Sequence, residues 1–173
     1  MYERILVPID GSNTSLQGLD EAVRLATLTH GRLLLVNIVD QLKYVTGYET
    51  FGSYTSDLLP YMQHAGEEIL QHGLERAQRA GIPAETMLFT SLADRVCDVV
   101  IGQADAWKAD LIVIGTHGRH GVGRVLLGSD AEQILRISPV PVLLVRSKHT
   151  DSEAQAEPAP AAADVPHRVS IAA

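Results

Sequence analysis

Short apolar runs alternate along the first 146 residues with longer segments of helical periodicity. The runs at 4–9, 33–39, 84–90, 111–114 and 140–145 have the length and composition of β-strands. Most of them are nearly uninterrupted in their apolar character and end at turn-forming residues, a pattern typical of strands buried on both faces. The chain is therefore predicted to build its core around five strands.

Apolar positions recur at helical spacing between these strands. Leu16, Leu19, Val23 and Ala26 form the first such set, which ends at a break near Gly31. Further helices are predicted at about 58–80, 92–107 and 129–137. Because helices separate the strands, the crossovers should be right-handed and the sheet parallel. The predicted fold class is a doubly wound, Rossmann-like α/β fold, with a five-stranded parallel sheet and helices on both faces.

The composition changes after residue 146. Residues 147–173 contain eight alanines, three prolines and no aromatic residue, with two basic and four acidic side chains. So little bulky apolar surface cannot offset the entropy that is lost on ordering. We therefore expect residues 1–146 to fold as one domain and residues 147–173 to form a disordered Ala/Pro-rich tail.

Composition and charge exclude several classes of function. The 173 residues carry 14 basic and 21 acidic side chains, and a net charge of −7 has the wrong sign for binding along nucleic-acid phosphates. No apolar run approaches the roughly 18 residues of a membrane helix, and no basic stretch leads into an apolar segment at the start. A single cysteine, Cys97, allows no internal disulfide. We expect a cytoplasmic protein without nucleic-acid or membrane partners.

Ligands of doubly wound folds bind at the carboxyl ends of the strands, where the strand order reverses. The segment after the fourth predicted strand is rich in glycine, because Gly115 to Gly128 holds five of the chain's 14 glycines. Such density indicates close backbone approach or turns with positive φ. This segment is the first candidate for a ligand site.

Two common phosphate-binding motifs do not fit the segment. The dinucleotide fingerprint fails at Leu126, and the P-loop pattern lacks its lysine and hydroxyl because Arg124 and Val125 occupy those positions. The pattern that fits is G-x2-G-x9-G-[ST], carried by Gly115, Gly118, Gly128 and Ser129.

With this pattern the sequence resembles the universal stress protein family, and specifically its ATP-binding branch. The resemblance runs from the opening VPIDGS to LGSDAEQILRISPVPVLLV and covers residues 1–146. It implies an adenine nucleotide alpha hydrolase-like fold and a bound ATP, with any Mg²⁺ held by the phosphates.

The resemblance also implies roles for individual positions. Residues that end the first strand would lie under the nucleotide, and the backbone that ends the second strand would contact adenine. The glycine segment would pass beneath ribose and phosphates, and the helix that follows would hold the phosphates at its N-terminus. The implied nucleotide-binding residues are Pro8, Asp10, Gly11, Ile38, Gly115, Thr116, His117, Gly118, Arg119, Gly128, Ser129 and Asp130.

Structural explanations compete at several of these positions. Ser129 and Glu132 fit a capping box, in which the serine only bonds the amide of Glu132. Asp10 fits a turn or cap, and the glycines fit turns. The Asp130 carboxylate suits the helix dipole but repels phosphate. Arg119 fits a solvated position as well as a phosphate contact.

The seven histidines do not form a metal-binding pattern. His64 and His72 lie eight residues apart, whereas a ligand pair on a helix requires four. His117 and His120 have no acidic or cysteine partner at close ligand spacing. We expect no metal site made of side chains alone.

Aromatic side chains gather in the connection from Tyr44 to Tyr61, which holds five of the chain's eight. They either fold back onto the core or form a contact surface. Cys97 and Trp107, in the third predicted helix and at its end, are interpreted as packing residues.

The last predicted strand is apolar on both faces and lies at a sheet edge in the family's strand order. An uncovered edge strand is an aggregation hazard. The resemblance implies that it pairs antiparallel with its copy in a two-fold homodimer. The implied interface residues are Val140, Val142, Leu143, Leu144 and Val145.

The function implied by the resemblance is an ATP-binding, nucleotide-responsive regulator of the stress response, read by an unknown protein partner. A slow ATPase or nucleotidyl-transfer enzyme could use the same pocket, and a third hypothesis is a nucleotide-free interaction scaffold. The glycine segment has no lysine, and no general base or acidic pair for Mg²⁺ is evident. The sequence therefore favours binding over catalysis, with no catalytic residue assigned.

Overall fold

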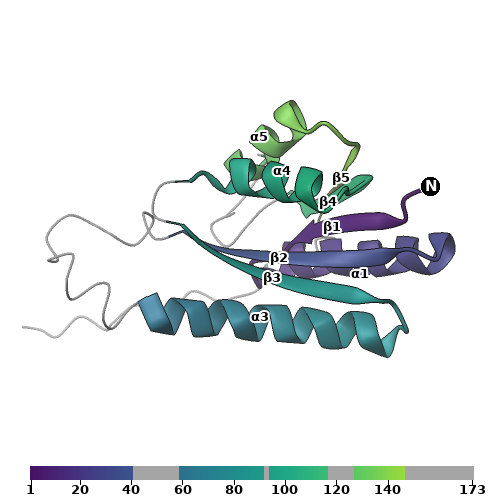
Figure 1. Ribbon diagram of the computed structural model, residues 1–173, viewed down its shortest axis with the longest axis horizontal. Helices are drawn as coiled ribbons and strands as arrows, with labels where there is room; N and C mark the ends of the chain where they lie inside the picture. Colours follow the sequence, from purple (N-terminus) through teal and green to yellow (C-terminus); the bar gives the residue numbers. More distant parts are fainter. Residues whose placement is uncertain (41–58, 92–93, 117–126, 147–173) are drawn as a thin grey trace, which may run out of the picture.

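The computed structural model describes residues 1–40, 59–91, 94–116 and 127–146 (Figure 1). The strands are β1 (Arg4–Pro8), β2 (Arg32–Asp40), β3 (Ala84–Ser91), β4 (Leu111–Gly115) and β5 (Val142–Val145). The helices are α1 (Asn13–Thr29), α3 (Leu59–Arg79), α4 (Val96–Ala106) and α5 (Ser129–Ile137). All strand pairs are parallel, in the order β3-β2-β1-β4-β5. The predicted doubly wound α/β fold is confirmed.

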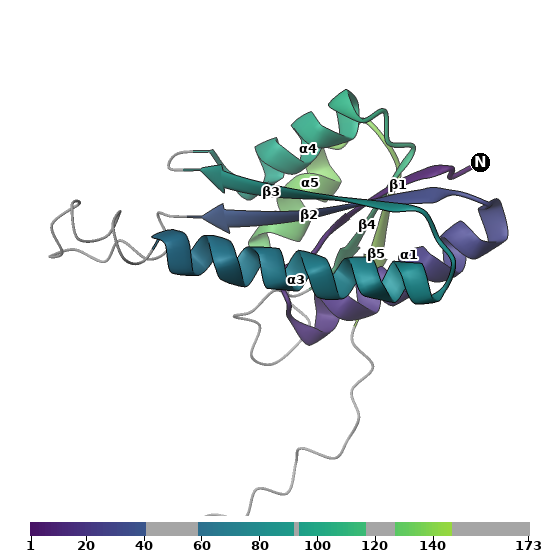
Figure 2. The ribbon, with the colours of Figure 1, turned by 60° about the horizontal axis from the view of Figure 1, so that its bottom comes forward.

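Alternating side chains of the strands build one core on each face of the sheet. In β1, Ile5 and Val7 pack with α1 and α3, whereas Leu6 packs with α4 and α5. The same alternation holds in β2, β4 and β5. Figures 1 and 2 show α3 along one face and α4 and α5 across the other. A strand that packs on both faces must be apolar at every position, which explains the uninterrupted apolar runs.

The start of β1 is held by the turn that precedes β4. The Asp110 carboxylate accepts hydrogen bonds from the backbone amides of Glu3 and Arg4, at 2.8 and 3.1 Å. The Arg4 side chain donates to the carbonyl of Trp107 at 2.8 Å and lies over its ring, 4.4 Å from the centroid. Trp107 is a partly buried packing residue, as expected.

Cys97 lies in the core between the sheet and α4. Cys97 is 1% exposed, which confirms its interpretation as a packed thiol. The sulfur lies 3.3 Å from Oε1 of Gln133 on α5. Burial, reinforced by the neighbouring Asp98 carboxylate, raises the pKa of the Cys97 thiol.

Two predicted segment boundaries differ from the structure. The third helix begins at Val96 rather than near residue 92, and β5 begins at Val142 rather than at Val140. Before β5, the Ser138 hydroxyl donates to the carbonyl of Val140 and accepts from its amide, which keeps that residue in a turn. Local side-chain hydrogen bonds of this kind compete with strand pairing.

Two sequence predictions fall on other parts of the chain. Most of the aromatic connection, up to residue 58, and the whole predicted tail of 147–173 lie outside the described residues. Tyr61, in the first turn of α3, is 71% exposed. None of the helices in the described ranges is both long and apolar enough to cross a membrane.

Candidate functional site

The strand order reverses between β1 and β4. The chain passes from β1 to β2 on one side of the sheet, whereas β4 pairs with β1 on its other side. The helix after β1 packs on one face, and the helix after β4 packs on the opposite face. The connections therefore diverge at the carboxyl ends of these two strands, which is where ligands of doubly wound folds bind.

A tight turn joins β1 to α1 at this point. Asp10 Oδ1 accepts the Ser12 amide at 2.9 Å, and Gly11 has a φ of +82°, in the left-handed region. Ser12 caps α1, because its hydroxyl accepts the amide of Ser15 at 3.2 Å. The turn role expected as an alternative for Asp10 is thus present, and its amide also bonds the Ser15 hydroxyl at 3.3 Å.

Gly115, the last residue of β4, is required by the packing of α1. A Cβ atom at this position would lie 2.8 Å from the carbonyl carbon and oxygen of Thr14. Gly18 of α1 faces the same place, since its own Cβ would lie 3.4 Å from the amide nitrogen of Gly115. The fold itself thus accounts for this glycine of the G-x2-G-x9-G-[ST] pattern.

Thr116 and Gly128 bring the start of α5 to the end of β4. The Thr116 amide donates to the carbonyl of Val145 at 2.9 Å, and its carbonyl accepts the Gly128 amide at 2.7 Å. Thr116 is buried. One residue therefore connects β4, β5 and α5, and it aligns the first turn of α5 with the carboxyl edge of the sheet.

The capping box that was considered as the alternative role of Ser129 does not form. Gly128 occupies the cap position without a side-chain hydrogen bond, and its carbonyl accepts the amide of Glu132 at 2.9 Å. Ser129 is consequently the first helical residue, so its hydroxyl is not used as a cap. The amides of the first helical turn point out of this end of the helix and carry its positive dipole.

Two carboxylates lie in the first turn of α5, where they suit the helix dipole but repel other anions. Asp130 and Glu132 both lie there, and Glu132 forms an ion pair with Arg136 at 2.7 Å. Any anion at this end of the helix would therefore meet backbone donors and a serine hydroxyl beside acidic side chains. The backbone amides and the serine hydroxyl suit phosphate oxygens, whereas the two carboxylates weaken the attraction of this helix end for an anion.

The end of β2 holds a residue that the sequence reasoning missed. Asn37 is buried, and its side-chain amide donates to the carbonyl of Ile9 at 2.7 Å, just beyond β1. The next residue, Ile38, is partly buried and pairs in register with Phe89 of β3. A polar residue within the run LLLVNIV was the available signal. Asn37 therefore ties the carboxyl ends of β1 and β2 together.

The structure brings only part of the expected site together. Pro8 ends β1 and is followed by Asp10 and Gly11, Gly115 ends β4 and is followed by Thr116, and Gly128 caps α5, which begins with Ser129 and Asp130. Ile38 lies near the end of the neighbouring strand β2. The expected residues that lie outside the described ranges are His117, Gly118 and Arg119.

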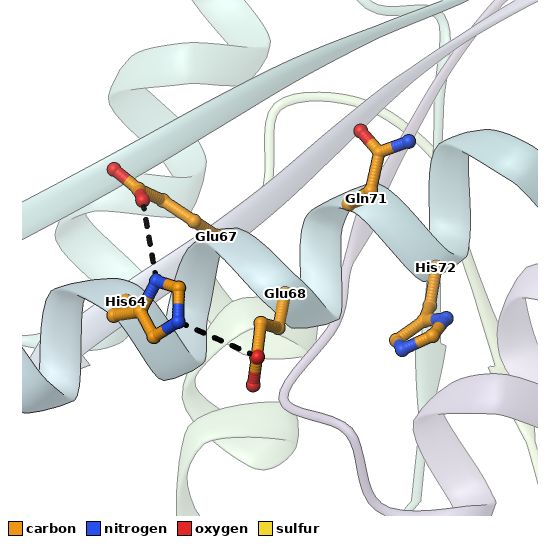
Figure 3. A pocket seen from close by; sticks show the side chains of 5 residues that line it. All are labelled: His64, Glu67, Glu68, Gln71 and His72. Atoms are coloured by element: carbon orange, nitrogen blue, oxygen red, sulfur yellow. Dashed lines mark ion pairs between the residues drawn. The ribbon is translucent and has the colours of Figure 1, made fainter.

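Titratable side chains also gather on the exposed surface of α3, in a shallow depression (Figure 3). His64 lies 4.0 Å from Glu67 and 3.5 Å from Glu68, while His72 lies further along the same helix. All of these groups come from a single helix and are exposed to solvent. Within the ranges that the structure describes, no group of three or more His, Cys, Asp or Glu side chains could hold a metal ion.

The fold and the divergence of its loops define a doubly wound α/β protein with a candidate ligand site between β1 and β4. The model of the universal stress protein family matches residues 1–146. A universal stress protein of Methanocaldococcus jannaschii is 32% identical over 148 residues, which are 84% of this chain and 83% of that protein. The chain belongs to the universal stress protein family.

Solved structures of the family show the same architecture. A member from Burkholderia pseudomallei is 32% identical, with a TM-score of 0.67, over 83% of this chain and 95% of that one. A universal stress protein in complex with cAMP is 26% identical, with a TM-score of 0.59, over 84% of this chain and 97% of that one.

Proposed function

We propose that this protein binds an adenine nucleotide, ATP in particular, between the ends of β1 and β4 and acts as a nucleotide-responsive regulator in the stress response. The observation that carries the proposal is the hydrogen bond from the Gly128 amide to the Thr116 carbonyl at 2.7 Å. It sets the donor-rich end of α5 beside the point where the strand order reverses. The relative in complex with cAMP supports an adenine nucleotide as the ligand class.

The nucleoside would lie along the ends of the first two strands. In the proposal Pro8 and Asp10 lie under adenine and ribose, and the backbone of Ile38 contacts the adenine edge. Asn37 supports this arrangement, because it fixes the spacing between the ends of β1 and β2 through its bond to Ile9. Buried polar side chains that bond backbone groups hold their neighbours in one geometry.

The phosphates would bind at the start of α5. Backbone amides of Ser129 and the two residues after it, together with the Ser129 hydroxyl, would donate to phosphate oxygens, whereas the Asp130 carboxylate would repel the phosphates. A Mg²⁺ ion held by the phosphates would reduce this repulsion. Binding would alter the surface at the carboxyl edge of the sheet, and a protein partner would read that surface.

The protein would act as a homodimer through β5. This strand lies at the edge of the sheet and all four of its residues are only partly buried. Antiparallel pairing with a second copy would satisfy the open backbone groups of β5 and cover Val140, Val142, Leu143, Leu144 and Val145.

The decisive experiment identifies the ligand directly. Purified protein is denatured and any released nucleotide is identified by mass spectrometry, and calorimetric titrations use ATP, ADP, AMP and cAMP with and without Mg²⁺. We expect a carried adenine nucleotide or saturable binding heat. The absence of both a carried nucleotide and binding heat at millimolar ATP would contradict the proposal. Production of ADP under excess ATP would instead favour the slow ATPase.

A further inference from the structure

A depression of about 500 Å³ lies between α4 and α5, beside the proposed phosphate site. The α5 residues that line it are spaced three and four apart, so they share one face of the helix from its first residue to its last. At 1.5 Å per residue this face is about 12 Å long. The lining residues are Arg95, Ser129, Glu132, Gln133, Arg136 and Ile137.

The charge of this depression differs from that of the domain. Its lining includes two arginines, each paired with one carboxylate, Arg95 with Asp98 and Arg136 with Glu132, whereas residues 1–146 carry 12 basic and 17 acidic side chains. Two guanidinium groups whose charge is balanced locally repel an anion less than the surrounding acidic surface does. The depression is therefore a candidate subsite for negative charge.

Arg95 is held in a fixed orientation at the edge of α4. Its Nε and Nη2 atoms donate to the two Asp98 carboxylate oxygens, at 2.9 and 3.2 Å. The remaining nitrogen, Nη1, lies 3.5 Å from Oε1 of Gln133, at the long limit of a hydrogen bond. A guanidinium that is fixed on one side keeps its other donors for a stronger acceptor, such as a phosphate oxygen.

The position of this donor relative to Ser129 determines what it could contact. Gln133 lies four residues after Ser129, so its side chain is one helical turn further along the same face. Arg95 therefore contacts the side chain of a residue whose backbone lies about one turn, roughly 5 Å along the helix axis, beyond Ser129, and Arg95 and Ser129 line the same depression. Arg136 lies nearly one turn further and is paired with Glu132.

We propose that Arg95, assisted by Arg136, binds the terminal phosphates of a nucleotide whose first phosphate is held at Ser129, so that the site distinguishes nucleoside triphosphates from monophosphates. This inference rests on the proposed nucleotide site and adds its selectivity. The phosphate chain extends from Ser129 along the exposed face of α5, and its terminal oxygens replace the weak Gln133 contact of Arg95.

Calorimetry on the full chain tests this selectivity. ATP and AMP are titrated, with Mg²⁺ present, into the native protein and the Arg95→Gln, Arg95→Lys and Arg79→Gln variants. Arg79 is the matched control, because it is an exposed arginine paired with Glu75 on α3. We expect Arg95→Gln to lower ATP affinity about tenfold and AMP affinity less than twofold, since one charge-assisted contact is lost. Arg95→Lys should retain part of the ATP affinity, and Arg79→Gln should change neither.

Distinct results would overturn the inference and the proposed function. Equal losses for ATP and AMP would show that Arg95 only positions α4, and no loss for ATP would show that it does not contact the ligand. Either result would leave nucleotide binding intact and overturn the subsite alone. A native protein that binds neither ATP nor AMP would overturn both proposals. Denaturant unfolding of each variant verifies that affinity, and not folding, has changed.

Discussion

The carbonyl oxygen of Thr116 accepts the amide of Gly128 at 2.7 Å, so the end of β4 and the beginning of α5 are joined directly. Thr116 also bonds the carbonyl of Val145 through its own amide. The site that we propose is therefore built on a junction of two strands and a helix. Its geometry depends on backbone contacts that most side-chain substitutions leave in place.

Substitution of Gly115 by alanine should destabilise the fold. The new Cβ would lie 2.8 Å from the Thr14 backbone, which requires α1 to shift away from β4. We expect a loss of about 1–3 kcal/mol in the free energy of unfolding, the usual cost of overpacking. Urea unfolding followed by circular dichroism measures the change.

Gly102 provides the matched control for that substitution. It is an exposed glycine within α4, and no atom lies within 4 Å of a Cβ built there. Gly102→Ala should raise the unfolding free energy by about 0.5–1 kcal/mol, because alanine is the better helix former. Equal effects at both positions would contradict the packing role of Gly115.

The two serines at helix starts should differ in their contribution to stability. Ser12→Ala removes the cap of α1 and should cost about 1 kcal/mol of unfolding free energy. Ser129→Ala should leave that free energy nearly unchanged, because the hydroxyl does not cap α5. The same Ser129 variant should weaken ATP binding several-fold in calorimetry. A large loss of stability without a change in affinity would restore a purely structural role for Ser129.

Proline at position 142 should separate the proposed dimer. Ile112 of β4 and Thr116, directly after β4, donate to the carbonyls of Pro141 and Val145, so Pro141 and Val145 direct their backbone groups toward β4. The intervening Val142 directs its amide outward, because backbone groups alternate along a strand. Val142→Pro thus removes an outward donor and retains the contacts to β4.

Light scattering measures the outcome for this edge. We expect a monomer mass for Val142→Pro and a dimer mass for the control Val142→Thr, with a folded circular dichroism spectrum for both. Leu143→Asp should also yield monomer, at a greater cost in stability because Leu143 packs against the core. A dimer mass that persists in Val142→Pro would assign the interface to another surface.

Cys97 should make the fold sensitive to alkaline pH. Burial raises its pKa in the folded state, so the folded protein retains the thiol proton at a pH where the unfolded chain, with a pKa of about 8.5, has lost it. The associated stability is complete below that pH and is lost as the pH rises through the folded pKa. Unfolding free energies of the native protein and Cys97→Ala should therefore converge at high pH. Parallel curves from pH 7 to 10 would contradict this role.

The sequence predicted the fold because strands buried on both faces require continuous apolar runs. Leu33, Leu34 and Leu35 illustrate the rule, since neighbouring residues pack against opposite cores and all must be apolar. The glycine pattern indicated the family but not why each glycine is needed. Gly115 is required by its contact with Thr14, which lies about 100 residues earlier in the sequence.

The site was less predictable from the sequence, because its geometry depends on single residues in the third dimension. The helix cap lies at Gly128, one residue before Ser129. The amide of Glu132 therefore donates to the Gly128 carbonyl and not to the Ser129 hydroxyl, as the capping box required. Asn37 was missed because its partner, the Ile9 carbonyl, lies just beyond the neighbouring strand β1 and is distant in the sequence. Arg95 was missed because its relation to Ser129 depends on how α4 packs against α5.

The fixation of β1 by Asp110 and Trp107 has a practical consequence for binding measurements. Both residues hold the first strand at its amino end, the edge of the sheet opposite the candidate site, and Figure 2 shows the N-terminus away from the arrowheads of β2 and β3. Met1 is 85% exposed there. A biotin or fluorophore attached at this end would immobilise or report on the protein while leaving the carboxyl edge of the sheet accessible to nucleotides.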